Sequence, residues 1–208
     1  MPDIGSSYFL SHCPGECGLY LALTGNRIGL ADALAWGLMT HSVSAAHHEE
    51  ILARLADGEA VEAAIAAHAR PKPPPPLAGQ LARIDTIFGA SSVEAVLERL
   101  DRDGGEFAAD TAGVIRGRSP TSLKLAFELL RRGKRLSLRE CLKMEYRAAC
   151  RMVMGHDFRE GVRAQLLEKD GNPRWQPSSL AAVEEADIAG YFVSLGAREL
   201  ELGETSRE

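Results

Sequence analysis

A run of prolines about one third of the way along the chain places the strongest constraint on its fold. Residues 70–76 read Arg-Pro-Lys-Pro-Pro-Pro-Pro. Because proline lacks a backbone N–H and restricts the residue before it, this segment forms neither a helix nor a central strand. A rigid spacer is the favoured interpretation, and a polyproline recognition ligand is the alternative. We therefore divide the sequence into residues 1–69, a linker at 70–78 and a C-terminal region at 79–208.

Sequence patterns after the linker predict helices throughout. Ser91-x-x-Glu94 and Ser137-x-x-Glu140 match the capping box that begins a helix. Pro120 suits the first turn of another helix. The helix after Ser137 is expected to bury an apolar face, whose members are Leu138, Leu142, Tyr146, Ala149 and Val153. Two further helical stretches are predicted near residues 157–167 and 183–192.

Short helices and one short strand are predicted before the linker. Gly25 is expected to end a helix that contains the apolar run at 19–23. Residues 38–43 are the best strand candidate. The alanine-rich stretch at 45–69 is predicted to be helical, with a break at Asp57-Gly58.

Composition excludes several classes of protein. The chain has 208 residues with 24 Lys or Arg and 29 Asp or Glu, so its formal net charge is −5. An acidic balance disfavours nucleic-acid binding, which needs a basic surface. No stretch approaches the roughly 20 apolar residues of a membrane-spanning helix, and the first residues do not resemble a signal peptide. These features predict a globular cytoplasmic protein with no nucleic-acid or membrane partner.

The cysteines and histidines do not form a recognisable metal-binding motif. The four cysteines lie at positions 13, 17, 141 and 150, without a Cys-x-x-Cys pair. We expect them to be reduced and mostly buried. His47-His48-Glu49-Glu50 resembles a fragment of His-Glu-x-x-His, but the second histidine is absent, so a solvated helix start is expected. The sequence thus predicts no metal ligand and no cofactor.

No catalytic motif is recognisable from spacing alone. Glycine-rich nucleotide loops, Gly-x-Ser-x-Gly elbows and a Ser/His/Asp order are all absent. Asp157 is interpreted as a helix N-cap, with Glu160 completing a capping box. Arg159 and Arg163 are then expected to be exposed or paired with nearby carboxylates. By composition alone, Asp3 would be a frayed terminal residue.

Several strings nonetheless resemble one family in order along the chain. Residues 1–10, Met-Pro-Asp-Ile-Gly-Ser-Ser-Tyr-Phe-Leu, are similar to the Phe-Pro-Asp-Val-Gly-Gly-Ser-Tyr-Phe-Leu segment of 3-hydroxyisobutyryl-CoA hydrolases in the crotonase superfamily. The match continues through the strings at 19–25, 39–41, 119–124, 144–147, 155–164, 169–170 and 173–175. The resemblance covers nearly the whole chain, and its motifs are specific to the hydrolase branch.

The resemblance implies a mainly α fold, namely the C-terminal helical part of a crotonase-like α/β fold. Residues 1–69 would be the end of the crotonase core, helical with one short strand. The implied activity is hydrolysis of 3-hydroxyisobutyryl-CoA to the free acid and CoA in valine catabolism, with CoA as part of the substrate. Family members are longer, and their N-terminal half supplies the oxyanion hole and a further active-site glutamate. Asp3 is the matching carboxylate in this chain, and we expect it to be catalytic and to contact the substrate.

Two departures from the family pattern lie beside Asp3. Met1 replaces a phenylalanine, and Ser6 stands where a second glycine is usual, which would restrict the turn if positive φ were needed there. Without the N-terminal half, Tyr8, Phe9, Leu19 and Leu21 are expected to form an exposed apolar patch. The chain alone is then expected to be inactive, and to form a homo-oligomer or to pair with a separate N-terminal half.

Two other functions remain open at this stage. One is hydration or isomerisation of an enoyl-CoA, and the other is a non-catalytic helical remnant that only binds a partner. Cytoplasmic location follows from the lack of a targeting segment, and mitochondrial location would apply to a eukaryotic chain with a truncated N-terminus.

Overall fold

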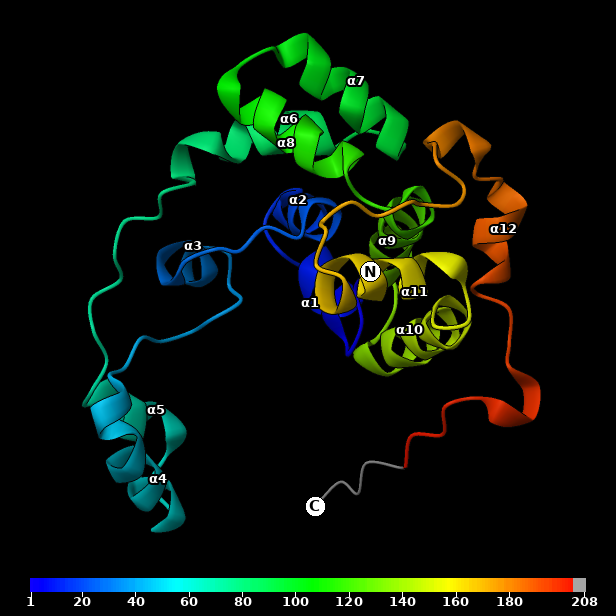
Figure 1. Cartoon of the computed structure of the whole chain (residues 1–208). Helices are drawn as coiled ribbons and strands as arrows, with labels where there is room; N and C mark the ends of the chain where they lie inside the picture. The colour runs from blue at the N-terminus through cyan, green and yellow to red at the C-terminus, as the bar shows by residue number, and fades with distance from the viewer. Residues whose placement is uncertain (204–208) are drawn as a thin grey trace. The chain divides into compact units, whose positions relative to one another are not determined.

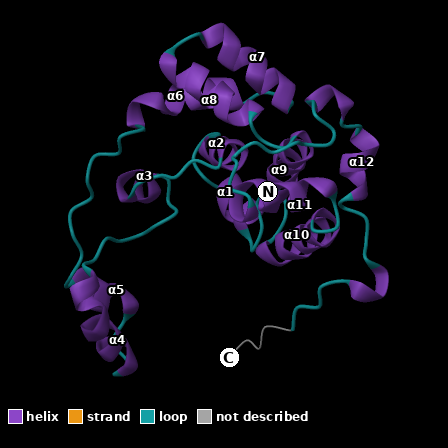
Figure 2. Ribbon diagram, in the orientation of Figure 1, coloured by secondary structure: helices purple, strands orange, loops and turns teal. Residues whose placement is uncertain are grey.

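The computed structural model describes residues 1–203, and the regular structure of these residues is helical (Figures 1 and 2). The chain forms two compact units, one made of residues 1–25 together with the chain from residue 83 onward, the other of residues 26–82. The α-helices are α1 (Ser6–Ser11), α2 (Cys17–Thr24), α3 (Leu30–Ala35), α4 (His48–Ala56), α5 (Val61–Ala66), α6 (Leu81–Phe88), α7 (Val93–Asp103), α8 (Glu106–Arg116), α9 (Pro120–Gly133), α10 (Leu138–Met152), α11 (His156–Val162) and α12 (Glu185–Gly190).

No strand occurs among residues 1–203, so the strand predicted at 38–43 is wrong. The backbone N–H groups of Leu38 and Met39 donate to the carbonyl of Ala33, at 2.9 and 3.1 Å. The run therefore begins as the turn that closes α3. An isolated strand would leave its backbone groups without ladder partners, so the local turn prevails.

Helix α9 lies at the centre of the first unit. Helices α1, α2, α7, α10 and α12 all contact it. One buried cluster combines residues of α9 and α10 with two that follow the long loop after α11: Leu125, Leu129, Cys141, Met144, Ala148, Val183 and Ile188. Met1, Tyr8 and Phe192 pack against this cluster and are partly buried.

The buried face of α10 differs from the predicted apolar stripe. Cys141, Met144, Glu145 and Ala148 are the buried residues of this helix. Leu138 and Tyr146 are each 38% exposed, and Val153, just beyond the helix, is 43% exposed. The stripe that faces the core is therefore the neighbouring one, while Leu142 and Ala149 of the predicted stripe are half-buried. The predicted face is therefore wrong.

Two glycines allow helices to approach α1 closely. A Cβ at Gly18 in α2 would lie 1.7 Å from the Leu10 carbonyl oxygen, and a Cβ at Gly133 would lie 2.6 Å from the Ser7 carbonyl oxygen. Leu19 in α2 is 3% exposed in this packing. The predicted exposure is therefore wrong for Leu19, Tyr8 and Leu21 are only half-buried, and Phe9 is exposed as expected.

Local helix signals are confirmed with one shift in position. Ser137 and Glu140 form the predicted capping box of α10, and Pro120 begins α9. Gly25 ends α2 with a φ of 68°. The cap of α7 is Ser92, whose side chain accepts from the Ala95 N–H, so the prediction of Ser91 is off by one residue.

Arg131 in α9 joins the N-terminal segment to the end of α6. Its guanidinium donates to both carboxylate oxygens of Glu16, at 3.0 and 3.1 Å. The same group donates to the carbonyls of Phe88 and Ala90 at 3.1 Å. One arginine therefore satisfies two backbone carbonyls at the end of α6 and just beyond it, as well as a partly buried carboxylate.

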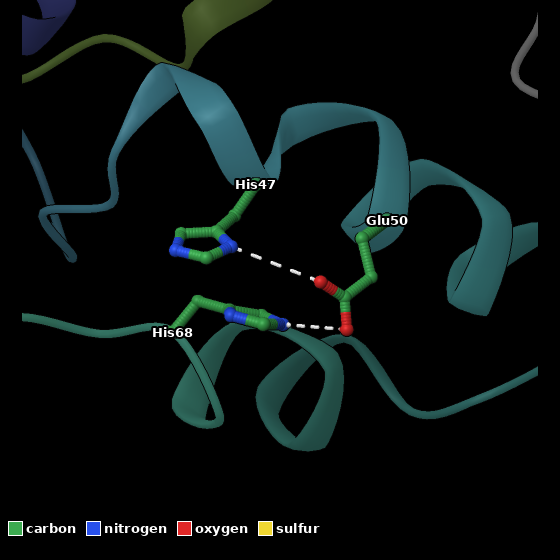
Figure 3. A group of neighbouring side chains, drawn as sticks. All are labelled: His47, Glu50 and His68. Carbon is green, nitrogen blue, oxygen red and sulfur yellow. Dashed lines mark ion pairs between the residues drawn. The ribbon is translucent and has the colours of Figure 1, made fainter.

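The second unit holds α3, α4, α5 and the proline-rich segment. The predicted break at Asp57-Gly58 is confirmed, because α4 ends at Ala56 and Gly58 has a φ of 84°. The Arg70 N–H donates to the Ser42 carbonyl at 2.8 Å, which closes the loop containing α4 and α5. Within that loop, the side chains of His47, Glu50 and His68 lie together (Figure 3).

Candidate active site around Asp3

The residue singled out by the sequence, Asp3, lies in a tight turn before α1. Its carbonyl accepts from the Ser6 N–H at 2.9 Å and from the Ser6 hydroxyl at 2.6 Å, and its own N–H donates to Ser6 Oγ at 2.7 Å. These bonds fix the backbone of Asp3. Its side chain is exposed.

Positive φ values in this turn fall on Ile4 and Gly5, at 55° and 85°. A non-glycine residue such as Ile4 rarely adopts this conformation, which therefore needs support from the surrounding structure. Ser6 already belongs to α1 and has no positive φ. The serine in place of the second family glycine therefore does not strain the turn.

The support comes from Glu145 in the middle of α10. Its carboxylate accepts from the Gly5 N–H at 2.5 Å and from the Ser7 N–H at 2.7 Å. Glu145 is only 2% exposed. A carboxylate at this position satisfies two of the four free N–H groups at the start of α1 and suits the positive end of the helix dipole. The turn that presents Asp3 is thus held by a residue that lies 140 positions after Gly5 in the chain.

A cavity of about 590 Å³ opens beside Met1, two residues before Asp3. Its walls come from the end of α8, the start of α9, the end of α10, α11 and the loop that follows. The lining includes six residues with polar side-chain groups: Arg118, Ser119, Ser122, Asp157, Gln165 and Trp175. The space lies within the first unit and is large enough for part of a small organic ligand.

Asp157 connects three walls of this cavity. The Ser119 hydroxyl donates to Oδ2 of Asp157, and the Gln176 N–H donates to Oδ1 at 2.8 Å. Gly155 is the cap of α11, without a side-chain hydrogen bond, so the predicted N-cap role of Asp157 is wrong. The physical reason is that α11 begins two residues earlier than an N-cap at Asp157 requires, so Asp157 lies in the first turn and its side chain bonds Ser119 at the start of α9.

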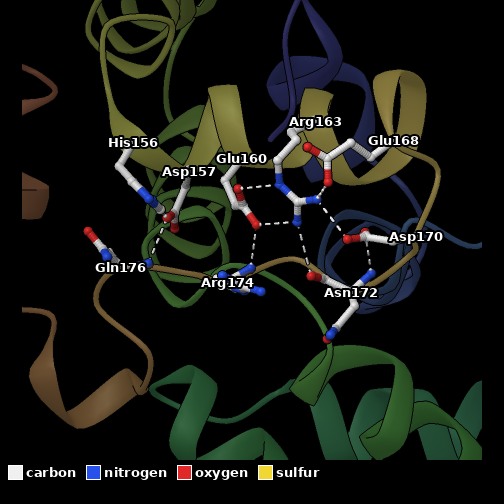
Figure 4. Close-up of polar contacts among 9 residues, drawn as sticks. All are labelled: His156, Asp157, Glu160, Arg163, Glu168, Asp170, Asn172, Arg174 and Gln176. Carbon is white, nitrogen blue, oxygen red and sulfur yellow. Dashed lines mark hydrogen bonds and ion pairs between the residues drawn. The ribbon is translucent and has the colours of Figure 1, made fainter.

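Arg163 forms the hub of a polar network that joins α11 to the loop after it (Figure 4). Its guanidinium pairs with Glu160 at 2.7 and 2.9 Å, with Asp170 at 2.7 Å, and with Glu168. It also donates to the carbonyl of Asn172 at 3.2 Å. The predicted pairing of Arg163 with nearby carboxylates is confirmed. The hub folds the loop after α11 back onto that helix.

The network shifts the pKa values of Glu160 and Arg163. Hydrogen bonds from the Arg163 side chain and the Arg174 N–H lower the pKa of Glu160 to about 2. Hydrogen bonds to Glu160 and Asp170 raise the pKa of Arg163 further above its ordinary value. Each group therefore keeps its charge through the physiological range. These pKa shifts favour a structural role for Glu160 and Arg163, which hold the loop after α11 in place.

Two residues of interest escaped the sequence patterns. Glu145 stands among apolar positions of α10, and the spacing of Cys141, Met144 and Ala148 was the signal that marks its face as buried. His68 lies beyond the break between α4 and α5, so no short motif links it to His47 and Glu50. Among residues 1–203, this histidine–glutamate group is the one set of side chains arranged to hold a metal ion. It belongs to the second unit, whereas Asp3 belongs to the first.

The comparisons with known proteins identify the class. The sequence matches the profile of the enoyl-CoA hydratase/isomerase family over residues 1–192, so the chain belongs to that family. A crystal structure of a carnitinyl-CoA dehydratase from Mycobacterium thermoresistibile matches with a TM-score of 0.87 and 39% identity, over 97% of this chain and 58% of that one. An enoyl-CoA hydratase from Rhodobacter sphaeroides matches with a TM-score of 0.86 and 32% identity over the same shares. The helical chain therefore fits the C-terminal part of the crotonase fold.

Curated relatives belong to the hydrolase branch. The mitochondrial 3-hydroxyisobutyryl-CoA hydrolase of Danio rerio is 40% identical over 211 residues, which is 97% of this chain and 55% of that protein. The human protein of the same name is 38% identical over 209 residues, or 96% of this chain and 54% of its own length. The chain spans about half the length of these relatives and matches their C-terminal half. The resemblance inferred from the motifs is confirmed.

Proposed function

We propose that this chain is the C-terminal part of an enzyme that hydrolyses 3-hydroxyisobutyryl-CoA to 3-hydroxyisobutyrate and CoA. The observation that supports this proposal most directly is the turn at Asp3. A motif of the hydrolase branch places a carboxylate there, and Glu145 fixes the backbone that carries it. The names of the curated relatives agree with this substrate.

In this proposal, Asp3 acts on the thioester carbonyl or on the attacking water. A carboxylate can serve as a nucleophile or a general base in acyl transfer. Hydrolysis also needs two N–H donors that stabilise the developing charge on the thioester oxygen, and the N-terminal half of the family supplies them. Loss of even one such donor costs about 10²–10³ in rate. We therefore expect the chain alone to be inactive.

The test is to restore the N-terminal half. The chain is co-expressed with the N-terminal portion of the Danio rerio relative that the alignment leaves uncovered. Release of free CoA thiol from 3-hydroxyisobutyryl-CoA is then measured for the complex and for each part alone. Thiol release by the complex only would support the proposal. A stable complex that binds acyl-CoA and releases no thiol would overturn it.

Enoyl-CoA hydration or isomerisation is the second candidate, because both solved structures named above carry dehydratase or hydratase titles. Loss of crotonyl-CoA absorbance without thiol release would favour this reaction. The third candidate, a non-catalytic helical partner-binding subunit, predicts a complex that shows neither change. A role in valine catabolism follows from the hydrolase activity.

Partners and location are further parts of the proposal. The family acts on acyl-CoA substrates, and no helix among residues 1–203 is long and apolar enough to cross a bilayer. We propose pairing with an N-terminal half or with a second copy of the chain. The mitochondrial location of the curated relatives favours the mitochondrial alternative for a eukaryotic source.

A further inference from the structure

The loop between residues 42 and 70 brings together three side chains that can bind a metal ion, two histidines and one glutamate. His47 immediately precedes α4, and Glu50 follows three positions later, so both lie on one face of the helix start. Helix α5 runs back beside α4, and His68 follows two residues after its last turn. The hydrogen bond from Arg70 to Ser42 closes the loop directly after His68. The backbone therefore fixes His68 opposite the pair on α4.

The three side chains converge on one point (Figure 3). Nε2 of His68 lies 3.2 Å from Oε1 of Glu50, and Nδ1 of His47 lies 3.7 Å from Oε2 of the same carboxylate. One ligand atom from each residue falls within 4.8 Å of the others. Ligand atoms around a tetrahedral zinc ion lie about 3.3 Å apart, given metal–ligand distances of about 2.0–2.1 Å. Small side-chain rotations thus bring all three atoms to coordination distance.

One of these atoms has no hydrogen-bond partner. Nε2 of His68 is buried, and it forms no hydrogen bond despite its closeness to Glu50. The His68 side chain as a whole is 13% exposed. Buried polar atoms almost always have a partner, because an unpaired one loses its hydration without compensation. A lone pair directed at a cation would resolve this deficit.

The arrangement of the rings also suits a shared cation. The imidazoles of His47 and His68 stack with centroids 4.3 Å apart and planes 23° apart. Both rings present a nitrogen to the same carboxylate, which accepts hydrogen bonds but donates none. A metal ion between the nitrogens and the carboxylate uses all three as donors of electron pairs. The Glu50 and His47 side chains are 57% and 44% exposed, so an ion can enter from solvent.

We propose that His47, Glu50 and His68 form a binding site for one divalent transition-metal ion of the Zn²⁺ type. Two imidazole nitrogens and a carboxylate oxygen are preferred ligands of such ions, whereas Mg²⁺ and Ca²⁺ prefer oxygen alone. Three protein ligands leave a fourth position for water. The site lies in the second unit and shares no residue with the Asp3 turn. It is therefore independent of the proposed hydrolase function.

The test measures metal binding by the tag-free full chain. Zn²⁺ is titrated calorimetrically into the wild type and into His47→Ala, Glu50→Gln and His68→Ala. We expect one ion per chain in the wild type. Because loss of even an outer partner of a metal ligand costs 10–100-fold in affinity, each variant should bind at least about tenfold more weakly. Wild-type affinity in all three variants would overturn the proposal.

Matched controls come from exposed histidines of the same unit. His41→Ala and His48→Ala remove imidazoles at exposed positions outside the cluster, and both should keep wild-type affinity. Co²⁺ in place of Zn²⁺ gives visible bands that report a low-coordinate site, and the absence of thiolate charge-transfer bands excludes the four cysteines as ligands. Thiolate bands would contradict the assignment.

A second measurement needs no variant and so does not depend on how the variants fold. The chain has six histidines. In the NMR spectrum of the wild type, one equivalent of Co²⁺ should broaden or shift the imidazole signals of His47 and His68 far more than the other four. Uniform effects on all six, or selective effects on other histidines, would overturn the proposal.

Discussion

The carboxylate of Glu145 accepts hydrogen bonds from the backbone N–H groups of Gly5 and Ser7, which lie 140 and 138 residues earlier in the chain. Both bonds are buried, and they hold the turn in which Ile4 and Gly5 have positive φ. Asp3 is the first residue of this turn. The position of the proposed catalytic carboxylate thus depends on a residue of α10 that itself need not contact substrate.

We expect Glu145→Ala to lower the free energy of unfolding by about 2–5 kcal/mol, because two buried N–H groups lose their acceptor. Urea unfolding followed by circular dichroism measures this change. The control is Glu128→Ala, which removes a partly exposed pair with Arg132 and should cost less than about 1 kcal/mol. Equal losses of stability in the two variants would show that the hydrogen bonds to Glu145 contribute no more than a partly exposed ion pair.

Two helical glycines should respond to alanine with opposite signs. A Cβ at Gly18 would meet the backbone of Leu10, so Gly18→Ala should destabilise the protein by about 1–3 kcal/mol or more. A Cβ at Gly113 in α8 meets nothing within 4 Å, so Gly113→Ala should stabilise it by about 0.5–1 kcal/mol through helix propensity. Thermal melts of both variants give the comparison. A stabilised Gly18→Ala protein would contradict the close packing of α1 and α2.

In the complex restored with an N-terminal half, Asp3→Asn should lower kcat by about 10²–10⁴-fold and change KM much less. The reason is that a general base or nucleophile acts mainly in the transition state. Steady-state thiol release measures both constants. Asp110→Asn, at an exposed position of α8, is the matched control and should keep parent kinetics. Parent activity in Asp3→Asn would remove this residue from the active site.

Lowering the pH should decrease the free energy of unfolding, because protonation of Glu160 removes its pairing with Arg163. Its pKa falls from an ordinary 4.5 to about 2 in the folded protein, so the unfolded state binds more protons in this window. The contribution of Glu160 is therefore complete above about pH 4.5 and is lost as pH falls toward 2. Urea midpoints measured across this range should fall less steeply in Glu160→Gln than in the wild type.

The control for this pH series is Glu98→Gln, which removes an exposed carboxylate on α7. Its midpoints should follow the wild-type slope. Parallel slopes for Glu160→Gln and the wild type would show that the contact with Arg163 does not persist in solution.

Local sequence signals predicted helix starts and ends correctly, because residues within one turn determine where these helices begin or end. The capping box at Ser137 and Glu140, the proline at position 120 and the glycine at position 25 each act within one helical turn, and all are confirmed. The strand at 38–43 failed because a strand needs a partner that the local sequence does not specify. The resemblance placed Asp3 in a family motif, although the backbone conformation around it was not predictable.

Long-range features escaped prediction for a common physical reason. The buried face of α10 depends on its packing with α1 and α9, helices whose positions the sequence of α10 alone does not specify. Glu145 lies on that face because its partners are backbone N–H groups, which no side-chain pattern reveals. His68 meets His47 only after α5 has turned back along α4.

The hub at Arg163 and the turn at Asp3 differ in the order in which they can form during folding. The partners of Arg163 lie 3, 5, 7 and 9 residues away. The Gly5–Glu145 bond closes a loop of 140 residues. Since closure entropy grows with the logarithm of loop length, the longer loop costs about 2.4 kcal/mol more than the nine-residue one. The loop after α11 can therefore fold early as a local unit, whereas the turn that presents Asp3 is completed only when α10 has met the N-terminal segment.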